Sequence, residues 1–198
     1  MSRLSNLLPL AFAGTALLSG FANAEAADNA LYGAPLPDDA AFVRWLDAPE
    51  GSKRMAFGAT FGPATQDDTA YAAVSAAHVS GAVAGGYYSI INGQTVVEPA
   101  RADATKVHLI LLNADDSPAR IMVADKDMQV IGDTAPGAAA SRAVNPISVA
   151  LAVVDATSGA ELGRFDVTLR RNQNITFLVH NGQVDMIQNG FGAVLKTN

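Results

Sequence analysis

The sequence contains no cysteine and only three histidines among its 198 residues. Without a thiol the chain cannot use cysteine catalysis, disulfide bonds or cysteine-bound zinc and iron–sulfur centres. The histidines, His78, His108 and His180, are far apart in sequence and do not follow a metal-binding spacing. We therefore predict no metal and no cofactor, while a histidine site assembled from distant strands stays open.

Charged residues are also scarce, at 16% of the chain, whereas hydrophobic residues make up 49%, a balance typical of a folded globular protein. The formal net charge is −6. A negative protein has no general attraction for nucleic acid, and it repels anionic glycans unless basic residues gather locally. The adjacent basic pairs are Lys53-Arg54 and Arg170-Arg171, which we interpret as solvated strand ends or turns in preference to ligand sites.

Sequence blocks that mark common hydrolases and nucleotide-binding enzymes are missing. A serine esterase of the SGNH type needs an early Gly-Asp-Ser block and a late Asp-x-x-His block, because a histidine oriented by a carboxylate must deprotonate the serine. The nearest match, Gly132-Asp133-Thr134, has threonine in place of serine and no Asp-x-x-His after it. Nucleophile-elbow, phosphate-loop and dinucleotide fingerprints are absent too. We predict no catalytic residues; an enzyme using Thr134 or His180 in an unfamiliar site is a minor alternative.

Residues 1–24 have the features of a secretory signal peptide. Arg3 precedes an apolar run, and the segment closes on Ala22-Asn23-Ala24, the small-x-small arrangement that signal peptidase accepts. The run is shorter than the roughly 20 residues that span a bilayer. We expect cleavage after Ala24, export, and a mature chain with no membrane anchor.

The dominant hydrophobic periodicity in the mature chain is two, which predicts strands with one buried face. Apolar and polar residues alternate through residues 147–153, 162–170 and 174–180, with Ile147 and Phe177 among the residues expected to point inward. Further short segments are rich in β-branched or aromatic residues and predict strands of a mostly antiparallel sheet: 42–46, 87–91, 107–112, 120–123 and 184–187. The alanine-rich segment 71–79 fits a short helix or a strand about equally well.

Turn residues support the same fold class. Asn92-Gly93 and Asn181-Gly182 each separate two apolar segments, and both predict two-residue hairpins. Such turns need positive φ at both central residues, which asparagine tolerates and glycine adopts without steric cost.

We therefore predict an all-β protein: two small antiparallel β-sandwich domains in tandem after a cleaved signal peptide. The expected limits are an N-terminal extension at 25–40, a first domain at 41–97, a polar linker at 98–105 and a second domain at 106–198. A single larger sandwich is the alternative.

Three aromatic residues are candidates for ligand binding. Trp45, Tyr87 and Tyr88 could form a platform on which sugar rings stack, as aromatic faces do in many carbohydrate-binding proteins. Packing in a hydrophobic core is the alternative for all three.

Several short segments together resemble one known family. They are residues 29–37, running into Ala41-Phe-Val-Arg44; the strand at 86–91; and Val144-Asn-Pro-Ile-Ser-Val149, leading into Asp155. In this order they resemble AlgF, the family of periplasmic accessory proteins of alginate O-acetylation. The resemblance covers nearly the whole mature chain. One departure is the region 59–85, which is alanine-rich and shorter than the corresponding part of the family pattern.

The resemblance implies a periplasmic protein of two β-sandwich domains without catalytic residues of its own. It implies a role in O-acetylation of alginate or a similar exopolysaccharide, as an adaptor between acetyltransferase components. The implied partners are SGNH-type polysaccharide acetyltransferases, a membrane acyltransferase and the polysaccharide itself. The alternative is a stand-alone periplasmic carbohydrate-binding module that uses Trp45, Tyr87 or Tyr88.

Overall fold

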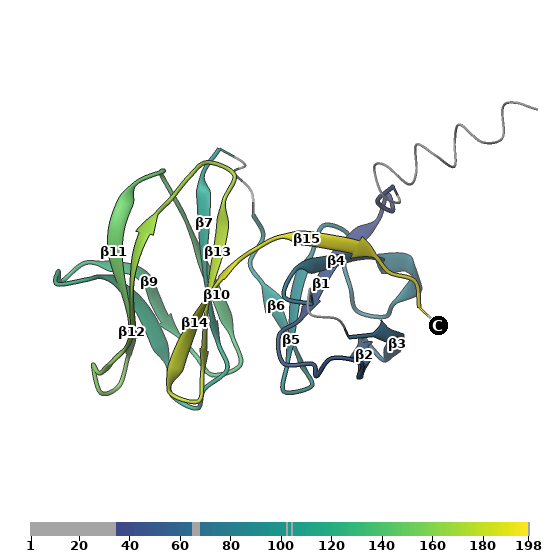
Figure 1. Cartoon of the computed structure of the whole chain (residues 1–198), viewed down its shortest axis with the longest axis horizontal. Coiled ribbons are helices and arrows are strands. Elements are labelled where there is room, and N and C mark those ends of the chain that lie inside the picture. Colours follow the sequence, from purple (N-terminus) through teal and green to yellow (C-terminus); the bar gives the residue numbers. More distant parts are fainter. Residues whose placement is uncertain (1–34, 65–67, 102, 104, 198) are drawn as a thin grey trace, which may run out of the picture. The chain divides into compact units, whose positions relative to one another are not determined.

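The computed structural model describes residues 35–64, 68–101, 103 and 105–197. The signal peptide predicted at 1–24 and most of the extension predicted at 25–40 lie outside these residues. The described residues form fifteen strands and a single 3₁₀ turn, η1 (Ala76–His78), so the all-β class is confirmed (Figure 1).

The first half of the fold, as we call it, is a five-stranded sheet covered on one face by a two-stranded hairpin. The sheet order is β15-β4-β1-β5-β6, from the strands β1 (Ala40–Trp45), β4 (Tyr71–Ser75), β5 (Tyr87–Ile91), β6 (Gln94–Glu98) and β15 (Phe191–Val194). The hairpin joins β2 (Lys53–Ala56) to β3 (Ala59–Pro63). One core lies between them, and its buried residues include Val43, Trp45, Phe61, Val74, Tyr88 and Ile90.

The second half is a sandwich of two four-stranded sheets. One sheet, which we call the central sheet, has the order β10-β7-β13-β14, from β7 (Val107–Asn113), β10 (Ala139–Val144), β13 (Asn174–His180) and β14 (Gln183–Gln188). The other has the order β12-β11-β8-β9, from β8 (Ala119–Val123), β9 (Gln129–Thr134), β11 (Ser148–Asp155) and β12 (Glu161–Thr168).

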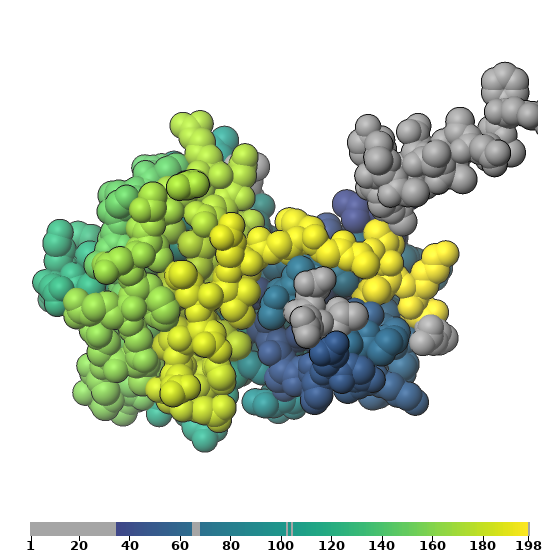
Figure 2. Space-filling view, in the orientation of Figure 1, coloured from purple at the N-terminus to yellow at the C-terminus, as the bar shows by residue number. Residues whose placement is uncertain are grey.

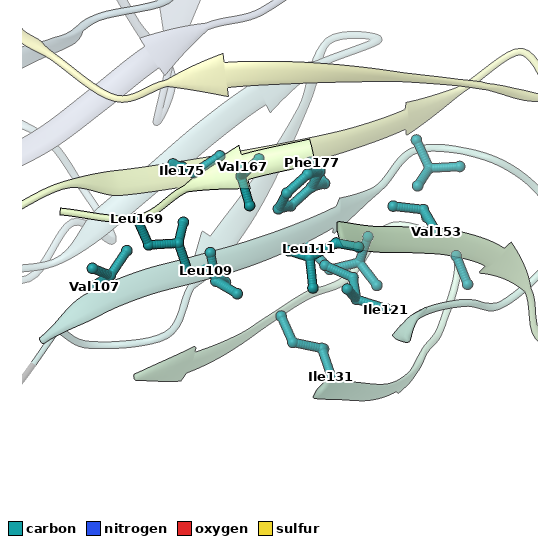
Figure 3. Close-up of a cluster of buried hydrophobic side chains, with 13 residues drawn as sticks. Val107, Leu109, Leu111, Ile121, Ile131, Val153, Val167, Leu169, Ile175 and Phe177 are labelled. Atoms are coloured by element: carbon teal, nitrogen blue, oxygen red, sulfur yellow. The ribbon is translucent and has the colours of Figure 1, made fainter. Parts of the chain in front are cut away.

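The core of the second half is made by the alternating apolar residues that the sequence pattern picks out. Leu109, Leu111 and Phe177 from the central sheet meet Ile121, Val153 and Val167 from the opposite sheet (Figure 3). Ile147 differs from the expectation. It precedes the start of β11 and is 57% exposed, so its predicted inward orientation is wrong.

Both predicted hairpins are confirmed. The central residues have positive φ, 50° and 69° at Asn92-Gly93 and 51° and 70° at Asn181-Gly182. These turns join β5 to β6 and β13 to β14 as antiparallel neighbours. In the ambiguous segment 71–79, the alternating pattern forms strand β4, and η1 follows directly after Ser75.

The sheets are mixed. Most described strand pairs are antiparallel, as expected, but β1–β5, β7–β13 and β4–β15 are parallel. A parallel pair needs a long connection, and here the chain supplies it by passing through other strands before it returns.

The C-terminal strand returns to the first half. After β14 the Tyr71 N–H donates to the Gly190 carbonyl, and β15 then pairs with β4 through Phe191 opposite Tyr71 and Val194 opposite Ala73. Figure 2 shows this C-terminal segment, in yellow, at the surface beside residues of the first half, in blue. The sheet of the first half therefore contains a strand, β15, from beyond residue 106, where the second domain was expected to begin. The domain limits themselves stay a prediction.

Candidate functional site

A buried group of charged and polar side chains joins the two halves, and we call it the Arg44 network. It begins on β1, where Val43 and Trp45 point into the first core and Arg44 points to the opposite face of the sheet. Arg44 is fully buried. Its Nε donates to Ser89 Oγ (2.7 Å), and its Nη2 donates to Glu98 Oε1 (2.9 Å).

The second half contributes two partners to Arg44. Its Nη2 also donates to Thr176 Oγ1 (2.9 Å), and its Nη1 donates to Asn189 Oδ1 (2.7 Å). Thr176 stands between Ile175 and Phe177 on β13, which both point into the sandwich core. Successive strand residues face opposite sides of a sheet. The central sheet is therefore buried on both faces, with an apolar core on one side and this network on the other.

Glu98 is the centre of the network. Its Oε1 accepts from Arg44 and from Ser89 Oγ (2.6 Å), and its Oε2 accepts from the Tyr71 hydroxyl (2.6 Å) and Arg101 Nη2 (2.9 Å). Burial by itself would raise the pKa of Glu98, but Arg44, Ser89, Tyr71 and Arg101 together hold that pKa below its usual range. The carboxylate is ionised and each oxygen has two donors, so it is suited to structure and not to proton transfer.

Aromatic rings enclose Arg101. Its guanidinium carbon lies 3.9 Å from the centre of the Tyr87 ring and 4.7 Å from that of Tyr71, which is cation–π geometry. Phe42 stacks on Tyr87 with ring centres 5.0 Å apart, and Phe191 of β15 packs against Phe42 in a T-shaped arrangement. Burial and the adjacent Glu98 carboxylate raise the pKa of Tyr71, which keeps its hydroxyl protonated as a donor.

An apolar cluster completes the contact between the halves. Ile91 and Val96 of the first half pack with Leu112 and Leu178 of the central sheet. The halves are thus joined by an ion-pair network and an adjoining apolar patch.

The three aromatic binding candidates do not form one platform. Trp45 is 4% exposed, donates from Nε1 to the Met55 carbonyl (3.0 Å) and packs against Phe61. Tyr88 is 3% exposed, and its hydroxyl accepts from the Val83 N–H (2.9 Å). Both rings lie in the first core, so neither offers a face to a glycan.

Tyr87, the third candidate, points to the other face of the sheet, as alternation along β5 requires. It is half-buried between Phe42 and Arg101. Its ring faces are therefore occupied by side chains of this chain.

Thr134 and His180 have different surroundings. Thr134 is buried, and its hydroxyl donates to the Gly132 carbonyl (3.1 Å). His180 Nε2 lies 2.7 Å from Asp185 Oδ2 beside a pocket of about 290 Å³. This pair has the geometry of a base and its orienting acid, but no serine, threonine, tyrosine or lysine is among the described residues that line the pocket.

The other histidines are separate from one another. His108 is buried and contacts the Asp103 carbonyl (2.9 Å), while His78 lies exposed in η1. Within residues 35–64, 68–101, 103 and 105–197, no three His, Asp or Glu side chains gather as a metal site would require. In the same part of the chain, no helix has the length and apolar character to cross a membrane.

The network was not apparent from the sequence, although one signal was present. Arg44 stands on the same strand face as Phe42 and Leu46, in a strand that is otherwise apolar on both sides. A lone arginine in such a strand needs a buried carboxylate partner. Its partners are distant in sequence, and Asn189 is 145 residues away.

Comparison with known proteins places the chain in a family. A family model described as "Alginate O-acetyl transferase AlgF" matches residues 15–176. The chain belongs to the AlgF family. Arg44, Glu98 and Thr176 lie inside the matched range, whereas Asn189 and strand β15 lie beyond its end. The family description links the chain to alginate O-acetylation.

Two solved structures of AlgF from P. aeruginosa are similar to parts of the chain. Its C-terminal domain is 24% identical over 42% of this chain and 96% of the domain, with a TM-score of 0.35. Its N-terminal domain is 17% identical over 44% of this chain and 98% of the domain, with a TM-score of 0.34. No curated protein matches the chain.

Proposed function

We propose that this protein is a non-catalytic periplasmic accessory protein of exopolysaccharide O-acetylation, and that it bridges acetyltransferase components acting on alginate or a similar polymer. The observation that carries the proposal is membership of a family described by alginate O-acetylation, over residues 15–176. The periplasmic location rests on the signal peptide predicted at 1–24.

The local chemistry of the candidate catalytic residues supports a non-catalytic role. The Thr134 hydroxyl is buried and engaged by a backbone carbonyl, and the His180–Asp185 pair faces a pocket whose described lining offers no nucleophilic hydroxyl or amine. The Glu98 carboxylate, which is fully buried, is engaged by donors at both oxygens. An acyl-transfer site needs a nucleophile within hydrogen-bond reach of its base.

The joined halves suit an adaptor. The Arg44 network and the adjoining apolar patch hold the first half against the central sheet. A protein with two β-structures held in one arrangement can present a partner surface on each without the entropic cost of ordering them at the moment of binding.

The experiment is a binding titration with the protein lacking its signal peptide. We expect it to bind the SGNH-type acetyltransferase and the detergent-solubilised membrane acyltransferase of the same machinery, each measured separately by biolayer interferometry. The same preparation should release no acetate from an acetyl ester above the rate of the buffer.

Two outcomes would contradict the proposal. The first is failure to bind either component at concentrations where the two enzymes are folded and active. The second is acetyl-ester turnover that is lost in Thr134→Ala or His180→Ala, because that would make the protein an enzyme.

A further inference from the structure

A polar groove of about 490 Å³ lies where the β12–β13 connection meets the end of β14. Its lining includes Arg170, Arg171, Gln173, Gln188 and Asn189. No aspartate or glutamate is among the described residues that line it. In a chain with a net charge of −6, a concave surface with two arginines and no acid is unusual.

The two groove arginines are exposed, and neither forms an ion pair with another described residue. The other described arginines are engaged. Arg142 donates to two backbone carbonyls, and five pair with carboxylates: Arg44, Arg54, Arg101, Arg120 and Arg164. Among the described residues, therefore, no carboxylate occupies the guanidinium donors of Arg170 and Arg171.

The turn that carries these arginines is closed by its own hydrogen bonds. The Gln173 N–H donates to the Arg170 carbonyl (3.2 Å), and the Gln173 side-chain oxygen accepts from the Arg170 N–H (3.0 Å). Asn172, between them, has a φ of 62°. A turn that is already ordered loses less entropy when a ligand binds.

The groove is connected to the Arg44 network through Asn189. The Asn189 side-chain oxygen accepts from Arg44 Nη1 and Thr176 Oγ1, and its amide nitrogen, which only donates, is buried without a hydrogen-bond partner among the described residues. Behind it, Arg44 and Arg101 face the single carboxylate of Glu98, an excess of one positive charge. Both the arginines and the field behind Asn189 favour an oxyanion.

We propose that this groove binds a carboxylate of a uronate-containing oligosaccharide, with Arg170 and Arg171 as its ligands. The inference rests on the proposed function, because the family description supplies alginate, a polyuronate, as the polymer. The guanidinium group of an arginine can bind a carboxylate in bidentate geometry. The neighbouring Gln188 amide is exposed and suits the hydroxyl groups of a sugar better than an apolar lining would.

The test is a titration of the purified protein, without its signal peptide, with fluorescently labelled alginate oligosaccharide at low ionic strength. The double variant Arg170→Gln/Arg171→Gln should bind at least about tenfold more weakly, because it loses charge-assisted hydrogen bonds. A matched double variant, Lys53→Gln/Lys126→Gln, removes the same charge from exposed residues outside the groove and should change the Kd by less than about twofold.

The double variant Arg170→Lys/Arg171→Lys keeps the positive charges but loses the planar, two-donor geometry of the guanidinium group. Its Kd should lie between those of the wild type and the glutamine variant. Circular dichroism of each variant should match the wild type, since all substituted residues are exposed. Binding by the wild type with loss in the glutamine variant alone supports the site. Equal weakening in the control variant Lys53→Gln/Lys126→Gln would overturn the proposal. Equally tight binding of a neutral oligosaccharide of the same length would overturn it too.

Binding of polyglutamate as tight as that of the oligosaccharide would also overturn the inference, because it would mean that an acidic polypeptide is the better ligand. No acetyltransferase is present in this titration. Its failure therefore leaves the adaptor proposal standing, and failure of the partner-binding experiment leaves the groove result standing.

Discussion

The two faces of the central sheet are both buried, but by opposite chemistry. On one face Leu109, Leu111 and Phe177 pack into the sandwich core, and on the other Thr176 completes the hydrogen bonds of Arg44. Residues that are neighbours on β13 thus belong to two different environments. Apolar packing tolerates changes in the residues that it contacts, whereas a buried charged network requires one geometry of donors and acceptors. We therefore infer that the core supplies stability and that the network fixes how the halves meet.

The energetics of the two faces differ accordingly. Burying apolar area contributes about 25 cal/mol per Å², with no requirement on direction. Burying Arg44 and Glu98 costs several kcal/mol per ion, which is offset only while every donor keeps its acceptor. The network therefore adds little net stability when intact and is costly when one member is removed.

The largest expected effect comes from removing the central cation. Arg44→Met should lower the free energy of unfolding by about 3–5 kcal/mol, because it leaves Glu98 buried with less charge compensation. Urea denaturation followed by circular dichroism measures it. Arg142→Met, at an exposed arginine, is the control and should cost less than about 1 kcal/mol. Equal costs for both would contradict the account.

Acid should weaken the network before it weakens the core. The pKa of Glu98 is lowered in the folded protein from its ordinary value of 4.5, so the unfolded chain takes up the proton more readily. The stability from this group is present above pH 4.5 and is lost as the pH falls through the lower, folded pKa. Stability measured from neutral pH down to this region should fall less steeply in Glu98→Gln than in the wild type. An identical slope would show that Glu98 does not titrate as described.

A matched pair on β13 compares the two faces at adjacent positions. Thr176→Val keeps the shape but removes the hydroxyl that bonds Arg44 and Asn189, and should cost about 1–3 kcal/mol. Ile175→Val, on the core face, removes one methylene and should cost about 0.5–1.5 kcal/mol. Thermal or urea unfolding of both variants ranks them, and a smaller cost for Thr176→Val would contradict the role given to the network.

The smallest effect is expected at a surface ion pair. Arg164 bonds Asp125 and Glu161, but all three are exposed and their pairing is screened by salt. Arg164→Gln should change the free energy of unfolding by less than about 1 kcal/mol, and the difference should shrink at high ionic strength. A cost comparable with that of Arg44→Met would mean that burial is not what distinguishes the two sites.

Local features of the fold were predictable from the sequence. Two such features are the Asn92-Gly93 and Asn181-Gly182 turns and the alternation of strands such as 174–180. They depend on residues that are close in sequence, so the local sequence is enough to predict them. The family could also be recognised, because its motifs are short segments in a fixed order.

Long-range features were not predictable in the same way. Alternation along β13 places Thr176 opposite the core residues, but nothing near it in sequence says that Arg44, 132 residues away, will cover it. The return of β15 to the first sheet is equally non-local. For Trp45 and Tyr88, aromatic rings are as suitable for a core as for a sugar platform, and only the three-dimensional packing decides between the two.

The most direct test of the proposed function is the acetyl content of the exopolysaccharide from a strain that lacks this gene, with and without complementation. The account predicts that the mutant loses acetyl groups while the polymer yield is preserved, and that the wild-type gene restores acetylation. Unchanged acetylation in the mutant would contradict the proposed role in O-acetylation.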